Sequence, residues 1–223
     1  SNAFLYAYDA ASRSMLARRS WLTVPFAATV GDTGGEGCHA SFRGQGASIV
    51  IERARREPYY GVHAEARGLS LTASLDARAA PPAIGAVAEV APGRFDATEK
   101  RALLGVRGEL RVEWRTVSLD GALGGYDFTS GMLARHTRWR WGFALGRLEG
   151  GTPFALNLVE GFVRDAECVA WIGRELVGLG EGCFTFDRAR PAEPWAVATR
   201  DRAARLTMTP GAVHEERRNF VVV

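Results

Sequence analysis

Hydrophobic and polar residues alternate along much of this chain with a period of two, the spacing at which successive side chains point to opposite faces of a β-strand. The clearest example is "GLSLTASLDAR", in which Leu69, Leu71, Ala73 and Leu75 alternate with serine, threonine and aspartate. This pattern predicts a strand with one buried face and one solvated face.

Several other segments carry strand or hairpin signals. The alternation returns in "GELRVEWRTVSLDG", through Trp114, and in "RWRWGFALG", while "GCFTFDR" and "NFVVV" read as short strands. Turn-forming residues predict hairpins around Gly173–Arg174 and near Asp201–Arg202. The best helical candidate is "FDATEKRALL", where Asp96 and Glu99 could form a capping box unless tertiary contacts make the segment a loop.

Many short strands with glycine-rich turns predict an all-β fold with very little helix. Antiparallel sheets must close or stack to protect their edges, so we expect lipocalin-like barrels or barrel-like sandwich lobes. The proline- and alanine-rich segment Ala77–Gly93 is the clearest candidate for a boundary between two structural units. It predicts an N-terminal β-lobe over residues 4–94 and a C-terminal β-lobe over residues 95–223.

Composition excludes several partners and cofactors. The 28 basic residues are balanced by 25 acidic ones and are scattered, so no nucleic-acid partner is expected. Arginine, alanine and glycine are abundant and Lys100 is the only lysine, a bias typical of a coding sequence rich in G and C. No apolar run approaches the roughly 20 residues that a membrane span needs.

The three cysteines form no CxxC pair, the four histidines lie far apart, and no phosphate-binding glycine motif precedes a helix. We therefore expect no metal and no cofactor, and a cytoplasmic protein. The oligomeric state is open.

The segment Gly121–Phe143 is the most informative for function. Alternation places Trp139 and Trp141 on one face of a strand and Arg138 and Arg140 on the other. In one interpretation the tryptophan face is core and the arginine face is solvated. In the other, the arginine face forms the wall of a polar cavity and needs acidic partners. The nearest acids along the chain are Asp127, Glu160 and Glu167.

Asp127 follows a Gly-Gly pair that reads as a turn and precedes the Thr129–Gly131 segment, which reads as a loop. Its side chain could bond to the backbone there, or it could exchange protons with His136 if burial shifted its pKa. Asn157 and Glu167 interrupt the apolar alternation of "FALNLVEGFVRDAECVAW". Buried polar groups need partners, so both belong to a hydrogen-bond network or contact a ligand.

The segments "FDATEKRALLGVRGEL", "YDFTSGMLARHTRWRWGFALG" and "FALNLVEGFVRDAECVAWIGREL" resemble the bacterial family called domain of unknown function 2804. The most specific feature is the pattern Asp127-x-Thr129-x-Gly131 followed by Thr137-x-Trp139-x-Trp141. That family is similar to lipocalin-like carotenoid hydratases and AttH-type proteins. The resemblance implies barrel-like lobes around a cavity for an apolar or amphipathic small molecule, but no established activity. It also implies further chain at both ends, so the N-terminal lobe is expected to be incomplete.

Three hypotheses for function result. The leading one is a small-molecule-binding protein whose ligand contacts come from residues in or near the motif: Asp127, His136, Arg138, Trp139, Arg140, Trp141 and Asn157. The second is a hydratase or hydrolase that uses Asp127 with His136 or Glu167, which requires Asp127 to be buried with a raised pKa. The third is a structural module without a ligand. The hypotheses differ in whether the "RWRW" strand borders an open pocket.

Overall fold

A computed structural model describes residues 2–22, 26–131, 138–161 and 163–215. Within these ranges the chain forms 18 strands in four antiparallel sheets and no helix, which confirms the predicted all-β class. Accordingly, the described residues contain no helix long and apolar enough to cross a membrane. The predicted "NFVVV" strand lies outside these ranges.

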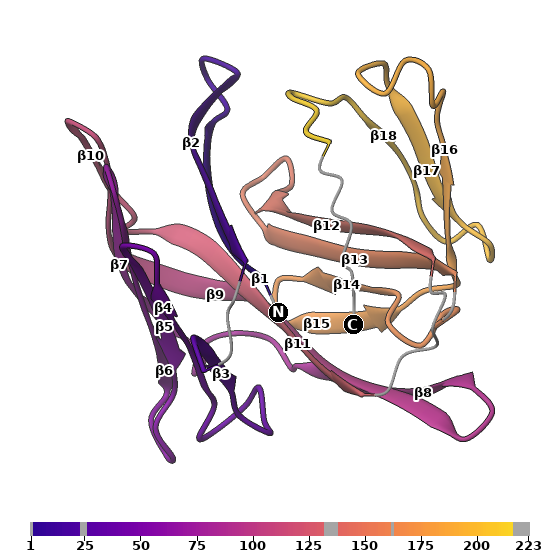
Figure 1. Ribbon diagram of the computed structural model, residues 1–223. Coiled ribbons are helices and arrows are strands. Elements are labelled where there is room, and N and C mark those ends of the chain that lie inside the picture. Colours follow the sequence, from indigo (N-terminus) through magenta and orange to yellow (C-terminus); the bar gives the residue numbers. More distant parts are fainter. Residues whose placement is uncertain (1, 23–25, 132–137, 162, 216–223) are drawn as a thin grey trace, which may run out of the picture.

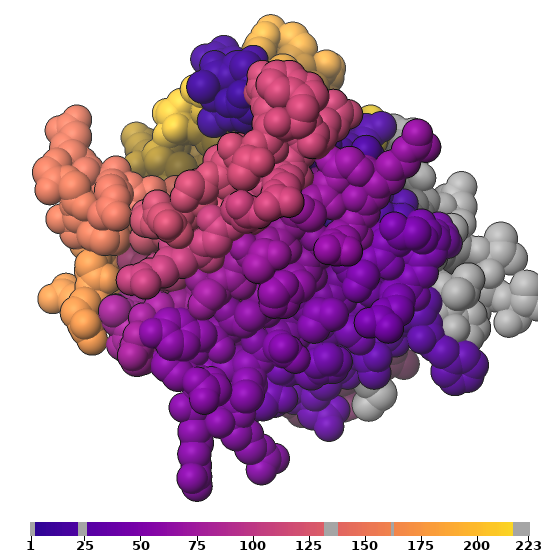
Figure 2. Space-filling model, turned by 90° about the vertical axis from the view of Figure 1, so that its left-hand side faces the viewer, coloured from indigo at the N-terminus to yellow at the C-terminus, as the bar shows by residue number. Residues whose placement is uncertain are grey.

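The largest sheet contains nine strands (Figure 1). In chain order they are β3 (Ala28–Val30), β4 (His39–Gly44), β5 (Ala47–Glu52), β6 (Tyr59–Ala66), β7 (Leu69–Asp76), β8 (Ile84–Ala91), β9 (Arg94–Val112), β10 (Arg115–Ser118) and β11 (Ala122–Gly131). The predicted "GLSLTASLDAR" strand is β7, paired with β6 and β9. Figure 2 shows the outer face of the N-terminal strands of this sheet as a broad continuous surface.

The 19-residue strand β9 connects the two halves of the fold. One of its edges pairs with β7 and then β8, and the other pairs with β10 and then β11. The helix predicted over "FDATEKRALL" is therefore wrong. Strands on both edges supply hydrogen-bond partners to the backbone of β9, and this pairing overrides the local capping signal. The sheet is continuous across residue 94, and the division into two lobes remains a prediction.

Three smaller sheets complete the structure (Figure 1). They are β1–β2 (Asn2–Asp9, Ser14–Leu22), then β12–β15 (Trp139–Arg147, Pro153–Gly161, Val169–Ile172, Glu175–Gly178), and β16–β18 (Gly182–Thr185, Trp195–Thr199, Arg205–Met208). The hairpins predicted around Gly173–Arg174 and Asp201–Arg202 are present as β14–β15 and β17–β18. The continuous strand predicted through Trp114 is wrong, because Glu113 has a φ of 54° and the chain turns there from β9 into β10.

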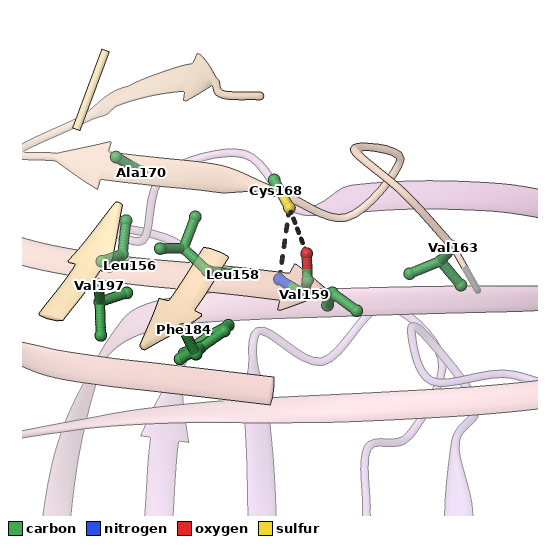
Figure 3. Packing of buried hydrophobic residues seen from close by; sticks show 8 residues of the cluster. All are labelled: Leu156, Leu158, Val159, Val163, Cys168, Ala170, Phe184 and Val197. Carbon is green, nitrogen blue, oxygen red and sulfur yellow. Dashed lines mark hydrogen bonds between the residues drawn. The ribbon is translucent and has the colours of Figure 1, made fainter. Parts of the chain in front are cut away.

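Two hydrophobic cores lie on opposite faces of the β12–β15 sheet. Toward β8 and β9, the fully buried side chains Ala102, Ala155 and Trp171 pack together. Toward β16 and β17, the second core includes Phe184 and Cys168, whose thiol bonds to both backbone groups of Val159 (Figure 3).

The β12–β15 sheet is therefore the middle layer of a sandwich-like stack, since apolar side chains leave both of its faces. A closed barrel, one of the two expected arrangements, does not form among the described residues. The sheets are open and pack face to face.

Candidate functional site

Three polar side chains project from one face of β9 into the interior. Asp96, Thr98 and Lys100 alternate along the strand, and their exposed fractions are 3%, 6% and 3%. Sequence reasoning missed this row because it assigned Asp96 to a helix cap and attributed the single lysine to base composition. The available signal was the period-two alternation of the three residues, which continues into the buried Ala102.

Strand β11 lies beside this row because its glycines permit a close approach. A Cβ at Gly125 would lie 2.7 Å from the backbone oxygen of Arg101, and the register shifts at this point. The turn predicted at the Gly-Gly pair and the loop predicted at Thr129–Gly131 are therefore wrong, since both lie within β11. The resulting register places Asp127 directly opposite Lys100.

Lys100 is the centre of a buried ion-pair network. Its Nζ lies 2.5 Å from Oδ2 of Asp127 and 3.1 Å from Oε2 of Glu167. The hydroxyl of Thr98 lies within 3.3 Å of the second oxygen of Asp127, to which it donates. A buried ammonium is tolerated only when opposite charges and hydrogen bonds replace its water, and these residues supply both.

Burial affects the three carboxyl groups near Lys100 differently. The side chain of Glu167 is 8% exposed, and burial raises its pKa although the nearby ammonium of Lys100 acts in the opposite direction. Burial also raises the pKa of Asp96, and its Oδ1 has no hydrogen-bond partner among the described residues. The side chain of Asp127 is 35% exposed and ion-paired, so the desolvation required of a catalytic acid occurs at Asp96 and Glu167 instead.

Asn157 holds two parts of the site in place. It is fully buried; its Oδ1 accepts a hydrogen bond from Nε1 of Trp141 at 2.7 Å, and its Nδ2 donates to the backbone oxygen of Glu167 at 2.7 Å. Asn157 is thus a member of a network, one of the two roles expected for it. It links the tryptophan strand to the segment that carries the buried glutamate.

A cavity of about 300 Å³, here called the charged cavity, separates β9 and β11 from β12 and β13. Its lining residues combine acids, one ammonium, two tryptophans and aliphatic groups: Asp96, Lys100, Asp127, Thr129, Trp139, Trp141, Val159, Val163 and Glu167. Trp139 and Trp141 are about half exposed, at 53% and 48%. The tryptophan face therefore borders an open space, and the interpretation of this face as packed core is wrong.

The arginine face of β12 points the other way, toward the β16–β18 sheet. Both terminal oxygens of Glu160 lie 2.8 Å from Nη1 of Arg140, and the same glutamate accepts the backbone N–H of Phe184. Glu160 is thus the acidic partner of Arg140. Arg138 and Arg140 line an open depression of about 560 Å³ and not the charged cavity, although Trp139 borders both. His136 lies outside the described residues.

The family model Domain of unknown function (DUF2804) matches residues 1–223. The chain belongs to this family. No curated protein and no solved structure matched it. Four residues of the motif by which the sequence resembles DUF2804, namely Asp127, Thr129, Trp139 and Trp141, line the charged cavity together.

The charged cavity of this DUF2804 chain offers two kinds of chemistry. Its buried carboxyl groups can hold or exchange a proton, and its tryptophan rings can bind an apolar or cationic group. Among the described residues, no group of three or more histidine, cysteine, aspartate or glutamate side chains is arranged to hold a metal ion. The carboxylates of Asp127 and Glu167 instead converge on the ammonium of Lys100.

Proposed function

We propose that this protein binds a small amphipathic molecule in the charged cavity. The observation that carries the proposal is the meeting of a buried polar cluster and two half-exposed tryptophans in one cavity. Ligand sites are concave and largely apolar, with a few convergent polar groups that orient the ligand. A structural module has no need for a buried charged cluster that opens onto a cavity, because unpaired burial of charge costs stability.

A second cavity gives the apolar part of such a ligand additional room. It has a volume of about 250 Å³, and Tyr60, Tyr126 and Phe128 contribute most of its aromatic surface. Asp127 and Thr129 are lining residues of both cavities. A molecule with a polar end beside Lys100 could therefore extend an apolar end along β11.

Thermal-shift and native mass-spectrometry screens with fatty acids, terpenoid alcohols and amines that carry an apolar group test this proposal. A ligand that binds the folded state raises the unfolding temperature and adds its mass to the protein. Trp139→Ala should weaken binding about tenfold or more, because the indole ring offers a large apolar surface and such surfaces dominate the lining of small-ligand sites.

Trp114→Ala is the matched control, because Trp114 is 81% exposed and lies in the β9–β10 turn. It should bind as the parent does. Absence of any temperature shift or mass adduct across the panel would favour the structural module. Equal losses in the two variants would show that the ligand binds elsewhere.

A hydratase or hydrolase is the second candidate function, favoured by the buried carboxyl group of Glu167 with its raised pKa. In a hydration, this carboxyl would protonate an alkene carbon, water would add to the cation, and the water's surplus proton would return to the carboxylate. Asp127 would be the second acid–base group. Incorporation of oxygen from labelled water into an alkene probe, lost in Glu167→Gln, would support this function; no incorporation would count against it.

A further inference from the structure

We propose that the ligand of the charged cavity carries an ammonium group, which binds Asp96 while an attached aromatic or apolar group packs on Trp139 and Trp141. This inference rests on the proposed function and specifies the chemical class of the ligand. It follows from the balance of charge in the cavity, one unpartnered oxygen, and the position of the aromatic rings.

Among the described residues, the charged cavity contains more carboxyl groups than its one ammonium can pair with. Three carboxyl groups of described residues line it, from Asp96, Asp127 and Glu167, and Lys100 is the one described cation in its lining. Lys100 ion-pairs with Asp127 and Glu167, and within the described ranges no cation forms a salt bridge with the carboxyl group of Asp96. A second positive charge in the cavity would pair with Asp96, whereas a ligand anion would place a further acidic group beside those of Asp96 and Glu167.

Asp96 provides the specific point of attachment. It is 3% exposed, it lines the cavity, and its Oδ1 is buried with no hydrogen-bond partner in the part of the chain that the structure describes. Buried polar atoms are almost always satisfied, and leaving one unsatisfied costs roughly 1–3 kcal/mol. An ammonium supplies three donors and would satisfy this oxygen with a charge-assisted bond. A ligand without a hydrogen-bond donor would leave Oδ1 of Asp96 without a hydrogen bond.

The tryptophans favour the same class of ligand. A cation binds over the face of a tryptophan ring within about 6 Å of its centroid. Lys100 already uses this interaction, since its Nζ lies 5.6 Å from the centroid of the Trp141 ring. The half-exposed ring of Trp139 lines the same space and can contact either the ammonium or the group attached to it.

A matched series of three probes tests the inference: phenethylamine, phenethyl alcohol and hydrocinnamate. They share an aromatic body and differ in the charge of the polar end. Labelling with carbon-labelled lysine gives one side-chain NMR signal, because Lys100 is the only lysine in the chain. That signal reports binding in the charged cavity directly, and titration of its shift gives the dissociation constant of each probe.

The amine should bind about tenfold or more tightly than the alcohol, and the acid should bind most weakly, since a charge-assisted hydrogen bond is about twice as strong as a neutral one. Asp96→Asn should weaken amine binding about tenfold and change alcohol binding less than threefold, because the amide keeps the shape and loses the charge. Glu109→Gln is the matched control: it removes a carboxylate that lies outside the charged cavity and pairs with Arg111 at the surface. It should bind all probes as the parent does.

The outcomes distinguish the amine inference from the proposed binding function. Binding of the alcohol or the acid as tightly as the amine overturns the amine inference and supports the proposed function. An amine preference that survives in Asp96→Asn overturns Asp96 as the attachment point. If none of the probes shifts the Lys100 signal at millimolar concentration, both the inference and the proposed binding function are overturned.

Discussion

Replacement of Lys100 by methionine would test whether the buried ion-pair network is organised as described. Methionine has a similar length and keeps the apolar stem of the side chain, but it removes the ammonium. Asp127 and Glu167 then lose their common partner. Removal of one member of a buried ion pair typically costs about 3–5 kcal/mol, because the remaining charge stays desolvated.

The exposure of the two acids places the expected loss near the lower end of this range. The side chain of Asp127 is 35% exposed and can regain water, whereas that of Glu167 is only 8% exposed. We therefore expect Lys100→Met to lower the free energy of unfolding by about 3 kcal/mol at neutral pH. For a chain of this size, the unfolding temperature should fall by roughly 6–12 °C. The loss should shrink in acid, where Glu167 becomes protonated and neutral.

Urea unfolding followed by tryptophan fluorescence at neutral and acidic pH measures these losses. The double variant Lys100→Met with Glu167→Leu should regain most of the stability, because it replaces the pair by apolar groups. Arg111→Met is the control for a surface ion pair and should cost less than about 1 kcal/mol. A Lys100→Met protein as stable as the parent, or a double variant no more stable than the single one, would refute the network.

Three further predictions concern the supports of the site. Asn157→Ala should lower the free energy of unfolding by about 2–4 kcal/mol in urea titrations, since it leaves the indole N–H of Trp141 and a buried carbonyl unpaired; a loss below 1 kcal/mol would contradict this role. The folded-state pKa of Glu167 lies above its ordinary value of 4.5, so the folded state binds the proton of Glu167 more tightly than the unfolded state does. The free energy of unfolding therefore falls as pH rises from 4.5 to the folded-state pKa. Glu167→Gln should flatten this pH dependence, and an unchanged slope in pH-resolved unfolding would argue against it. Gly125→Ala should cost about 1–3 kcal/mol because its Cβ would lie 2.7 Å from a backbone oxygen of β9, whereas Gly146→Ala, with nothing within 4 Å, should be tolerated in the same thermal-unfolding assay.

Much of the strand content is determined by the sequence. The period-two alternation of "RWRWGFALG" specifies β12 and separates its tryptophan face from its arginine face, and turn residues specify the β14–β15 and β17–β18 hairpins. These features depend on contacts between neighbours in the chain, so they can be read locally. The motif by which the sequence resembles DUF2804 can be read in the same way.

Which layer each face meets was decided only by the tertiary structure. Alternation places Trp141 and Arg140 on opposite faces of β12. It does not specify that Trp141 borders the charged cavity, or that Arg140 pairs with Glu160 on the side of the β16–β18 sheet. Strand β9 forms because β7, β8, β10 and β11 pair along both of its edges, although its local sequence also fits a helix cap. The role of Lys100 depends on acids from β11 and from the segment before β14. Pairing of β11 with β9 places Asp127 beside Lys100, whereas Glu167 reaches it because the β12–β15 sheet packs against β9.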